Sequence, residues 1–151
     1  MSNIKELAKQ SAEALLDSMG FDRTVTVREE ADLICVDIES SDASYIIGDD
    51  GSRLDDVQYL INRMIQKECP DAERVKVDCD SYRERTEARL LEKAVKLANK
   101  VLETGKPLRL NPLNAYHRRL VHNKLQEIQG ILTESEEGTA RYKRITIKKQ
   151  N

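Results

Sequence analysis

Residues 45–65 read YIIGDDGSRLDDVQYLINRMI, and this stretch decides how the first half of the chain folds. A short apolar piece ends in the tetrapeptide G-D-D-G at residues 48–51, and a helix is expected to begin directly after it. Apolar residues then recur every three or four positions, which predicts one buried helix face. Pro70 ends the helix, because proline clashes with the preceding turn and lacks an amide hydrogen. The apolar stripe consists of Leu54, Val57, Leu60, Ile61, Met64 and Ile65.

Elements on both sides of this stretch complete one α+β layer. Helical spacing predicts a first helix over residues 4–19, and alternating apolar residues predict strands over 24–27 and 33–38. We expect the polar pair at residues 29–30 to form the turn between these strands. A third strand over 75–79 follows the central helix, so the order is helix, strand, strand, helix, glycine turn, helix, strand. The first helix is expected to bury Ile4, Leu7, Ala8, Ala12, Leu15 and Met19.

The second half begins with a long helix, which is predicted over residues 82–103. A further helix is expected to start at Asn111 as N-cap, with Pro112 at its first position. Apolar runs at 131–133 and 145–147 then predict two antiparallel strands. The buried side of the shorter helix is expected to comprise Leu113, Tyr116, Leu120, Val121, Leu125 and Ile128.

These elements predict an α+β protein of two domains, residues 1–80 and residues 81–151, joined by the long helix. The formal net charge of −2 divides very unevenly between them. The first domain holds 9 Lys/Arg against 19 Asp/Glu, a net charge of −10, whereas the second holds 16 against 8, a net charge of +8. Such asymmetry points to a basic half that binds an acidic partner, of which nucleic acid is the commonest.

The cysteines and the N-terminal segment bear on the compartment. Cys35, Cys69 and Cys79 are odd in number and lack C-x-x-C spacing, so we expect reduced thiols and no disulfide framework. The first twenty residues mix charges with apolar positions, which is typical of neither a signal peptide nor a membrane span. We therefore expect a cytoplasmic protein with no membrane insertion, no metal and no cofactor.

The glycine turn has a definite physical use. Glycine lets a nucleic-acid backbone approach the peptide chain, and the next helix offers free amide groups to phosphate. A tight turn between two helices is the alternative interpretation. Asp49 and Asp50 place negative charge where a phosphate would lie, each opposing binding by about 1 kcal/mol or more at an effective dielectric near 20. We therefore expect weak binding there; a metal site is conceivable, but two adjacent carboxylates without further ligands seldom suffice.

Arg118 and His122 lie four residues apart in the segment NPLNAYHRRLVH, so a helix places them on one face. An arginine fork beside an imidazole suits a phosphate group, although a solvated surface pair is the common alternative. The pattern T-x-S-x-x-G at 133–138 and the cation-rich run RYKRITIKK at 141–149 follow, and they favour the phosphate interpretation.

Most of residues 4–80 resembles the prokaryotic, type II KH domain. Its signature, I-G-x-x-G between two helices, is matched at residues 47–51. The resemblance implies an αββααβ fold with Gly48 and Gly51 as nucleic-acid contacts. Members usually carry basic or neutral residues at the two middle loop positions, where this chain has aspartates.

The second half resembles the R-three-H domain, which is named for its Arg-x-x-x-His pair, in the version that closes Jag (SpoIIIJ-associated) proteins. The match runs through N-P-x-N-x-Y-x-R-R-L-V-H-x-x-L, T-x-S-x-x-G and K-R-I-T-I-K. It implies single-stranded RNA, or single-stranded DNA, held at phosphates by Arg118 and His122. His117 stands where those proteins more often have an acidic residue. Electrostatic support is expected from Arg119, Lys143, Arg144 and Lys148.

The resemblance also implies a regulatory or chaperoning role in RNA metabolism, linked to cell-envelope growth through a partner KH protein or a homodimer. Jag proteins commonly carry a further N-terminal domain. Because residues 1–3 are all that precede the first helix, we expect that domain to be missing.

Two other function classes remain as alternatives. An enzyme is not expected, because both histidines lie on one helix and His122 with Glu127, five residues apart, need not converge as an acid/base pair. A protein-interaction or dimerisation scaffold is the stronger alternative, in which the degenerate KH domain docks on a basic partner or on another copy. Salt titration separates the two, since binding to single strands weakens with a slope of about −0.7 per phosphate contacted.

Overall fold

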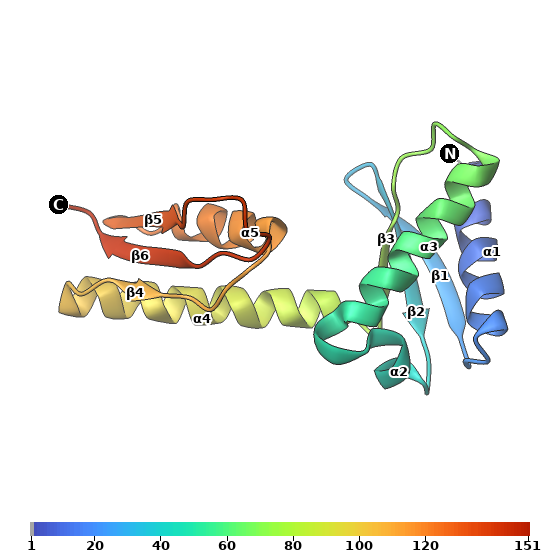
Figure 1. Ribbon diagram of the computed structural model, residues 1–151, viewed down its shortest axis with the longest axis horizontal. Coiled ribbons are helices and arrows are strands. Elements are labelled where there is room, and N and C mark those ends of the chain that lie inside the picture. Colours follow the sequence, from blue (N-terminus) through green and yellow to red (C-terminus); the bar gives the residue numbers. More distant parts are fainter. Residues whose placement is uncertain (1) are drawn as a thin grey trace. The chain divides into compact units, whose positions relative to one another are not determined.

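The computed structural model describes residues 2–151, which form two compact units. The N-terminal unit extends to Glu84 and the C-terminal unit covers Arg85–Asn151. Both units combine helices with a three-stranded sheet, so the expected α+β class is confirmed (Figure 1). Among the residues described, no helix has the length and apolarity to cross a membrane.

The N-terminal unit packs two long helices on one sheet (Figure 1). Strand β2 lies in the centre, antiparallel to β1 and parallel to β3. The predicted order of elements is confirmed, with one turn of 3-10 helix added within the glycine turn. The elements are α1 (Ser2–Ser18), β1 (Thr24–Glu30), β2 (Leu33–Glu39), α2 (Ala43–Ile47), η1 (Asp49–Gly51), α3 (Ser52–Glu68) and β3 (Lys76–Cys79).

The turn between β1 and β2 lies two residues later than predicted. Ala31 and Asp32 both have positive φ angles, 51° and 66°, and Glu30 pairs with Leu33 across them. This is the two-residue hairpin whose twist matches that of the flanking strands. The glutamates at 29–30 are exposed strand residues, so their polarity reflects solvent exposure and not a turn.

The core of the N-terminal unit includes one helix residue that the predicted stripe omitted. Leu16 is fully buried with Ala8 and Ala12, whereas Met19, which follows the end of α1, is 38% exposed. Asn62 is a buried polar residue, and its amide exchanges hydrogen bonds with both backbone groups of Val75 at 2.8 and 3.0 Å. These bonds satisfy a buried amide and attach the start of the third strand to α3.

Helix α4 (Tyr82–Thr104) begins in the N-terminal unit, where its first turn is anchored. The buried Asp78 carboxylate accepts the amide of Arg83 at 3.0 Å. The Arg83 guanidinium donates to the carbonyl of Val77 at 2.8 Å and pairs with Asp55 at 2.9 Å. The start of α4 is thereby bonded to both β3 and α3.

The C-terminal unit comprises the rest of α4, helix α5 and an antiparallel sheet in the order β4-β6-β5 (Figure 1). Residues from both helices and the sheet form one core, so this unit has its own hydrophobic interior: Ala94, Ala98, Val101, Leu110, Val121, Leu125, Ile131, Ile145 and Ile147. The additional elements are β4 (Leu108–Arg109), α5 (Ala115–Leu125), β5 (Ile131–Ser135) and β6 (Ile145–Lys149).

Helix α5 begins three residues later than predicted. Asn114, not Asn111, is the N-cap, and its side-chain oxygen accepts the amide of His117 at 2.8 Å. Leu113 instead pairs with Lys143 in an isolated bridge, which keeps the preceding segment extended. Tyr116 is 47% exposed, so it does not belong to the buried face as predicted. Ile128 packs against the core as predicted, but it lies beyond the end of α5.

Candidate nucleic-acid interface

The two units carry opposite charge at the boundary that the structure gives. The N-terminal unit holds 10 Lys/Arg against 20 Asp/Glu, a net charge of −10, and the C-terminal unit holds 15 against 7, a net charge of +8. Six of the eight predicted contact residues lie on or near α5 and β6 in the C-terminal unit, and the two glycines lie in the other unit.

Arg118 is occupied by backbone carbonyls. Its Nη1 donates to the oxygen of Leu113 at 2.6 Å and to that of Arg141 at 3.4 Å. The first oxygen precedes α5, and the second belongs to the segment that leads into β6. Arg118 therefore ties these two segments together, and its guanidinium is less free for phosphate than the sequence alone suggested.

His122 is exposed and lies within a small polar network. Its Nδ1 contacts the hydroxyl of Thr133 on β5, and its Nε2 lies 3.0 Å from the Nε2 of Gln126. The hydroxyl of Thr133 can donate or accept and the amide of Gln126 carries both kinds of atom, so this network accommodates either tautomer of the ring.

The sequence prediction did not include Gln126 as a partner of His122. The sequence did contain a signal for this contact, because Gln126 lies four residues after His122, just as His122 lies four residues after Arg118. Thr133 was predicted only as part of a motif. Its contact with α5 depends on how β5 packs, and no sequence spacing reports that.

The predicted supporting cations differ in their availability. Lys148 forms an ion pair with Glu134 on the neighbouring strand at 2.7 Å, where the strand register brings the two side chains to one face. Arg119, Lys143 and Arg144 have no carboxylate partner within residues 2–151. Among the predicted supporting cations, these three can meet a phosphate without first giving up an ion pair.

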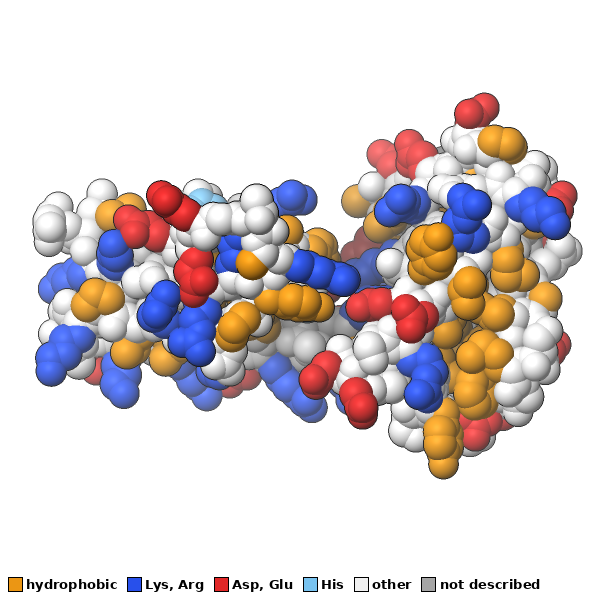
Figure 2. Space-filling model, in the orientation of Figure 1, with side chains coloured by type: hydrophobic (Ala, Val, Ile, Leu, Met, Phe, Trp, Pro, Cys, Tyr) orange, Lys and Arg blue, Asp and Glu red, His pale blue; other side chains and the backbone are white. Residues whose placement is uncertain are grey.

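A second basic surface follows α4 and was not predicted. Cations recur every three or four residues along the exposed side of this helix, and blue side chains follow it along the lower edge in Figure 2. The signal is simple helical periodicity, applied to charged residues as well as to apolar ones. The residues are Arg89, Lys93, Lys96 and Lys100, of which Lys96 is paired with Glu92.

The two glycines of the turn are required by packing. Gly48 and Gly51 have φ angles of 71° and 79°, which side chains rarely adopt. A Cβ on Gly48 would lie 2.7 Å from the Cβ of Arg53, and one on Gly51 would lie 2.8 Å from the ring of Tyr82. The turn therefore has a structural reason for both glycines, independent of any ligand.

Carboxylates surround this turn. Asp49 and Asp50 are exposed within it, Asp55 lies in the first turn of α3, and Asp56 follows it. Arg53 is the nearest cation in sequence, and its Nη1 donates to the carbonyl of Tyr45 at 2.7 Å. The local charge opposes phosphate, as predicted from the two aspartates.

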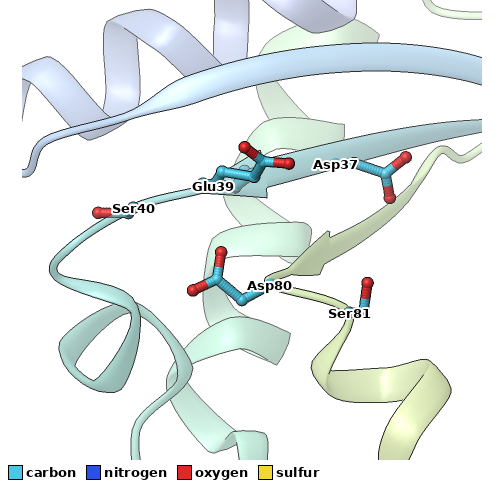
Figure 3. Close-up of a pocket in the computed structure, with 6 residues that line it drawn as sticks. Asp37, Glu39, Ser40, Asp80 and Ser81 are labelled. Atoms are coloured by element: carbon cyan, nitrogen blue, oxygen red, sulfur yellow. The ribbon is translucent and has the colours of Figure 1, made fainter.

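A cavity of about 440 Å³ lies at the ends of β2 and β3 (Figure 3). Its lining includes the carboxylates of Asp37, Glu39 and Asp80, which makes it unsuitable for a phosphate chain. Asp37 is already paired with Arg28 at 2.7 Å. Within the described residues, no group of three or more His, Cys, Asp or Glu side chains could hold a metal ion.

The buried thiols are unreactive by environment. Burial raises the pKa of Cys79 to about 12 and also raises the pKa of Cys35, so both remain protonated at neutral pH. All three cysteines are free. The two buried thiols, Cys35 and Cys79, therefore supply no activated nucleophile.

Comparison with known proteins identifies the domain type of the C-terminal unit and several relatives of the chain. A family model for the R-three-H domain matches residues 88–149, which confirms the predicted domain type in the C-terminal unit. The chain is 32% identical, over 98% of its length, to the RNA-binding protein KhpB of Clostridium symbiosum, of which it covers 68%. It is 27% identical over 78% of its length to the protein of the same name from Bacillus subtilis, and spans 57% of that relative. A third relative of that name, from Lactiplantibacillus plantarum, is 29% identical over 67% of this chain and is covered over 31% of its own length.

Proposed function

Because this chain belongs to the KhpB (Jag) family of RNA-binding proteins, we propose that it binds single-stranded RNA, mainly through its C-terminal unit and without catalysing a reaction. The observation that carries this proposal is a set of cations without carboxylate partners in the described part of the chain, on α5 and on the segment that leads into β6. Arg119, Lys143 and Arg144 lie in the unit of net charge +8 that the R-three-H model matches. Single strands are held by such basic surfaces through their phosphates.

The domain assignment forms part of the same proposal. We assign residues 1–80 to a KH domain and residues 81–151 to the long helix with the R-three-H domain. The αββααβ order and the compact division near Glu84 support this assignment. In the KH domain, Gly48 and Gly51 are proposed as weak nucleic-acid contacts, because the carboxylates around them oppose phosphate.

The roles of the predicted contacts differ in this proposal. His122, Arg119, Lys143 and Arg144 are proposed to meet the sugar-phosphate chain. Lys148 contributes after it releases Glu134.

We also propose a cytoplasmic location, which is supported by three cysteines that remain free thiols.

The test is a salt titration of RNA binding by the whole chain. Replacing Arg119, Lys143 and Arg144 together with alanine should reduce the slope of log K against log salt by about 2, since each phosphate that is no longer neutralised lowers it by about 0.7. A matched control replaces three exposed cations of the N-terminal unit, Arg63, Lys67 and Arg74. It removes the same charge and should leave the slope nearly unchanged. Equal slopes for both triple variants would refute the assignment to the C-terminal unit.

A second candidate function is a protein-interaction or dimerisation scaffold. The observation that favours it is a group of large exposed apolar residues in the N-terminal unit: Tyr45 at 62%, Tyr59 at 64% and Leu60 at 44%. Figure 2 shows hydrophobic side chains gathered on the visible face of this unit. Sedimentation of the wild type and of a Tyr45→Ser/Tyr59→Ser variant distinguishes the two functions. If the chain is a dimerisation scaffold, the variant should self-associate less than the wild type.

A further inference from the structure

Two short basic segments of the C-terminal unit each contain a tyrosine. Residues 116–119 read YHRR at the start of α5, and residues 141–144 read RYKR just before β6. Neither contains an acidic residue. Cationic side chains alternating with aromatic ones are typical of surfaces that hold single-stranded nucleic acid.

The fold attaches these segments to each other. Leu113 and Lys143 exchange two backbone hydrogen bonds, at 2.8 and 3.0 Å. Arg118 adds its bonds to the carbonyls of Leu113 and Arg141. The tyrosine segments therefore lie next to each other, although more than twenty residues separate them in the chain.

Both tyrosine side chains are solvent-accessible, so their ring faces can be reached by a ligand. Tyr116 is 47% exposed and Tyr142 is 55% exposed. The guanidinium of Arg141 lies 5.5 Å from the ring centre of Tyr142, and the His117 ring lies 5.6 Å from that of Tyr116. Each aromatic ring thus lies beside a planar cationic or polar group, a combination that suits a base and its phosphate.

We propose that Tyr116 and Tyr142 form a stacking site for unpaired nucleobases, with Arg118 as the positioning residue that holds their two segments together. This inference rests on the proposed function and deepens it, because it specifies unpaired nucleotides as the ligand. A duplex hides its base faces, so stacking of this kind requires single strands. The unpaired Arg119 and Arg144, one in each segment, supply charge for the phosphates between stacked bases.

Intrinsic fluorescence provides a direct readout, because the chain contains no tryptophan and the C-terminal unit contains only these two tyrosines. The whole chain is titrated with a short oligoadenylate and with an abasic oligonucleotide of the same length and charge. Tyr116→Leu and Tyr142→Leu should each weaken oligoadenylate binding by about 5-fold or more and reduce tyrosine quenching. Affinity for the abasic oligomer should stay unchanged. Tyr59→Leu, at an exposed tyrosine of the N-terminal unit, is the matched control and should alter neither affinity.

Arg118→Lys tests the positioning role. It keeps the charge but not the length or planarity of the guanidinium. Oligoadenylate affinity should fall while abasic affinity is retained, whereas a general loss of structure would lower both and overturn the role of Arg118.

The outcomes separate this inference from the proposed function. If the wild type binds neither oligomer, the proposed function fails and the stacking site fails with it. If the wild type binds both and the double variant Tyr116→Leu/Tyr142→Leu retains full affinity for each, the stacking site alone is overturned. An equal loss of affinity for both oligomers also overturns it, since stacking requires a base.

Discussion

Gly51→Ala should destabilise the N-terminal unit more than Gly20→Ala, although the two glycines share nearly the same φ angle. The angles are 79° and 77°. Placing alanine in this left-handed region costs about 1 kcal/mol or more at either position. A Cβ at Gly20 would meet nothing within 4 Å, whereas one at Gly51 would lie 2.8 Å from Cε1 of Tyr82.

The additional cost at Gly51 follows from that close approach. The Tyr82 ring packs against the N-terminal core at the start of α4, so it cannot simply swing into solvent. Forcing a methyl group into such packing costs about 1–3 kcal/mol. We therefore expect Gly51→Ala to lower the free energy of unfolding by about 2–4 kcal/mol and Gly20→Ala by about 1 kcal/mol.

Amide hydrogen exchange on β2 and β3 is the suitable assay, because it reports the stability of this unit separately from the other. Combining Gly51→Ala with Tyr82→Leu should recover part of the additional loss, since the smaller side chain leaves room for the methyl group. Equal losses of stability for Gly51→Ala and Gly20→Ala would refute the packing argument. Gly51 would then be required by its backbone conformation or by a ligand.

Three further predictions follow from charge and burial. Glu134→Gln should free Lys148 from its ion pair and steepen the slope of log K against log salt for RNA binding by about 0.7, which a salt titration measures. The free energy of unfolding, measured in urea, should change by less than about 1 kcal/mol. Asp49→Lys combined with Asp50→Arg should strengthen RNA binding about 10-fold or more, because two repulsions of about 1 kcal/mol each are removed, and unchanged affinity would show that the turn does not meet RNA. The pKa of Cys79 is raised to about 12 from its ordinary value of 9.0, so its contribution to stability is complete below pH 9 and is lost as the pH rises toward 12. Cys79→Ala should flatten that part of the stability curve in urea titrations.

The helical and strand elements were largely predictable because their information is local. Apolar residues at helical spacing gave α3 and α4 nearly to their ends, and alternation gave β3. One error occurred where a contact between distant segments overrode a local signal. Asn111 and Pro112 form a good helix start, but the bridge between Leu113 and Lys143 keeps that segment extended until Asn114 caps α5.

The candidate site was likewise predictable only where its information is local. Helical spacing alone placed Arg118 and His122 on one face, and the run of cations near the C-terminus was visible in the sequence. The sequence did not show which of these cations are free of an ion pair, because the pairing of Lys148 with Glu134 depends on strand register.

By itself, the sequence determined the order of elements, the opposite charges of the two halves and the positions of the cations along α5 and near the C-terminus. These properties depend on residue type and on spacings within single helices or strands. Only the tertiary structure decided that Arg118 holds two carbonyls, that Gly51 lies against Tyr82 and that the two segments with exposed tyrosines lie next to each other. Each of those depends on segments far apart in the chain, whose contacts exist only once hydrophobic burial has brought their elements together.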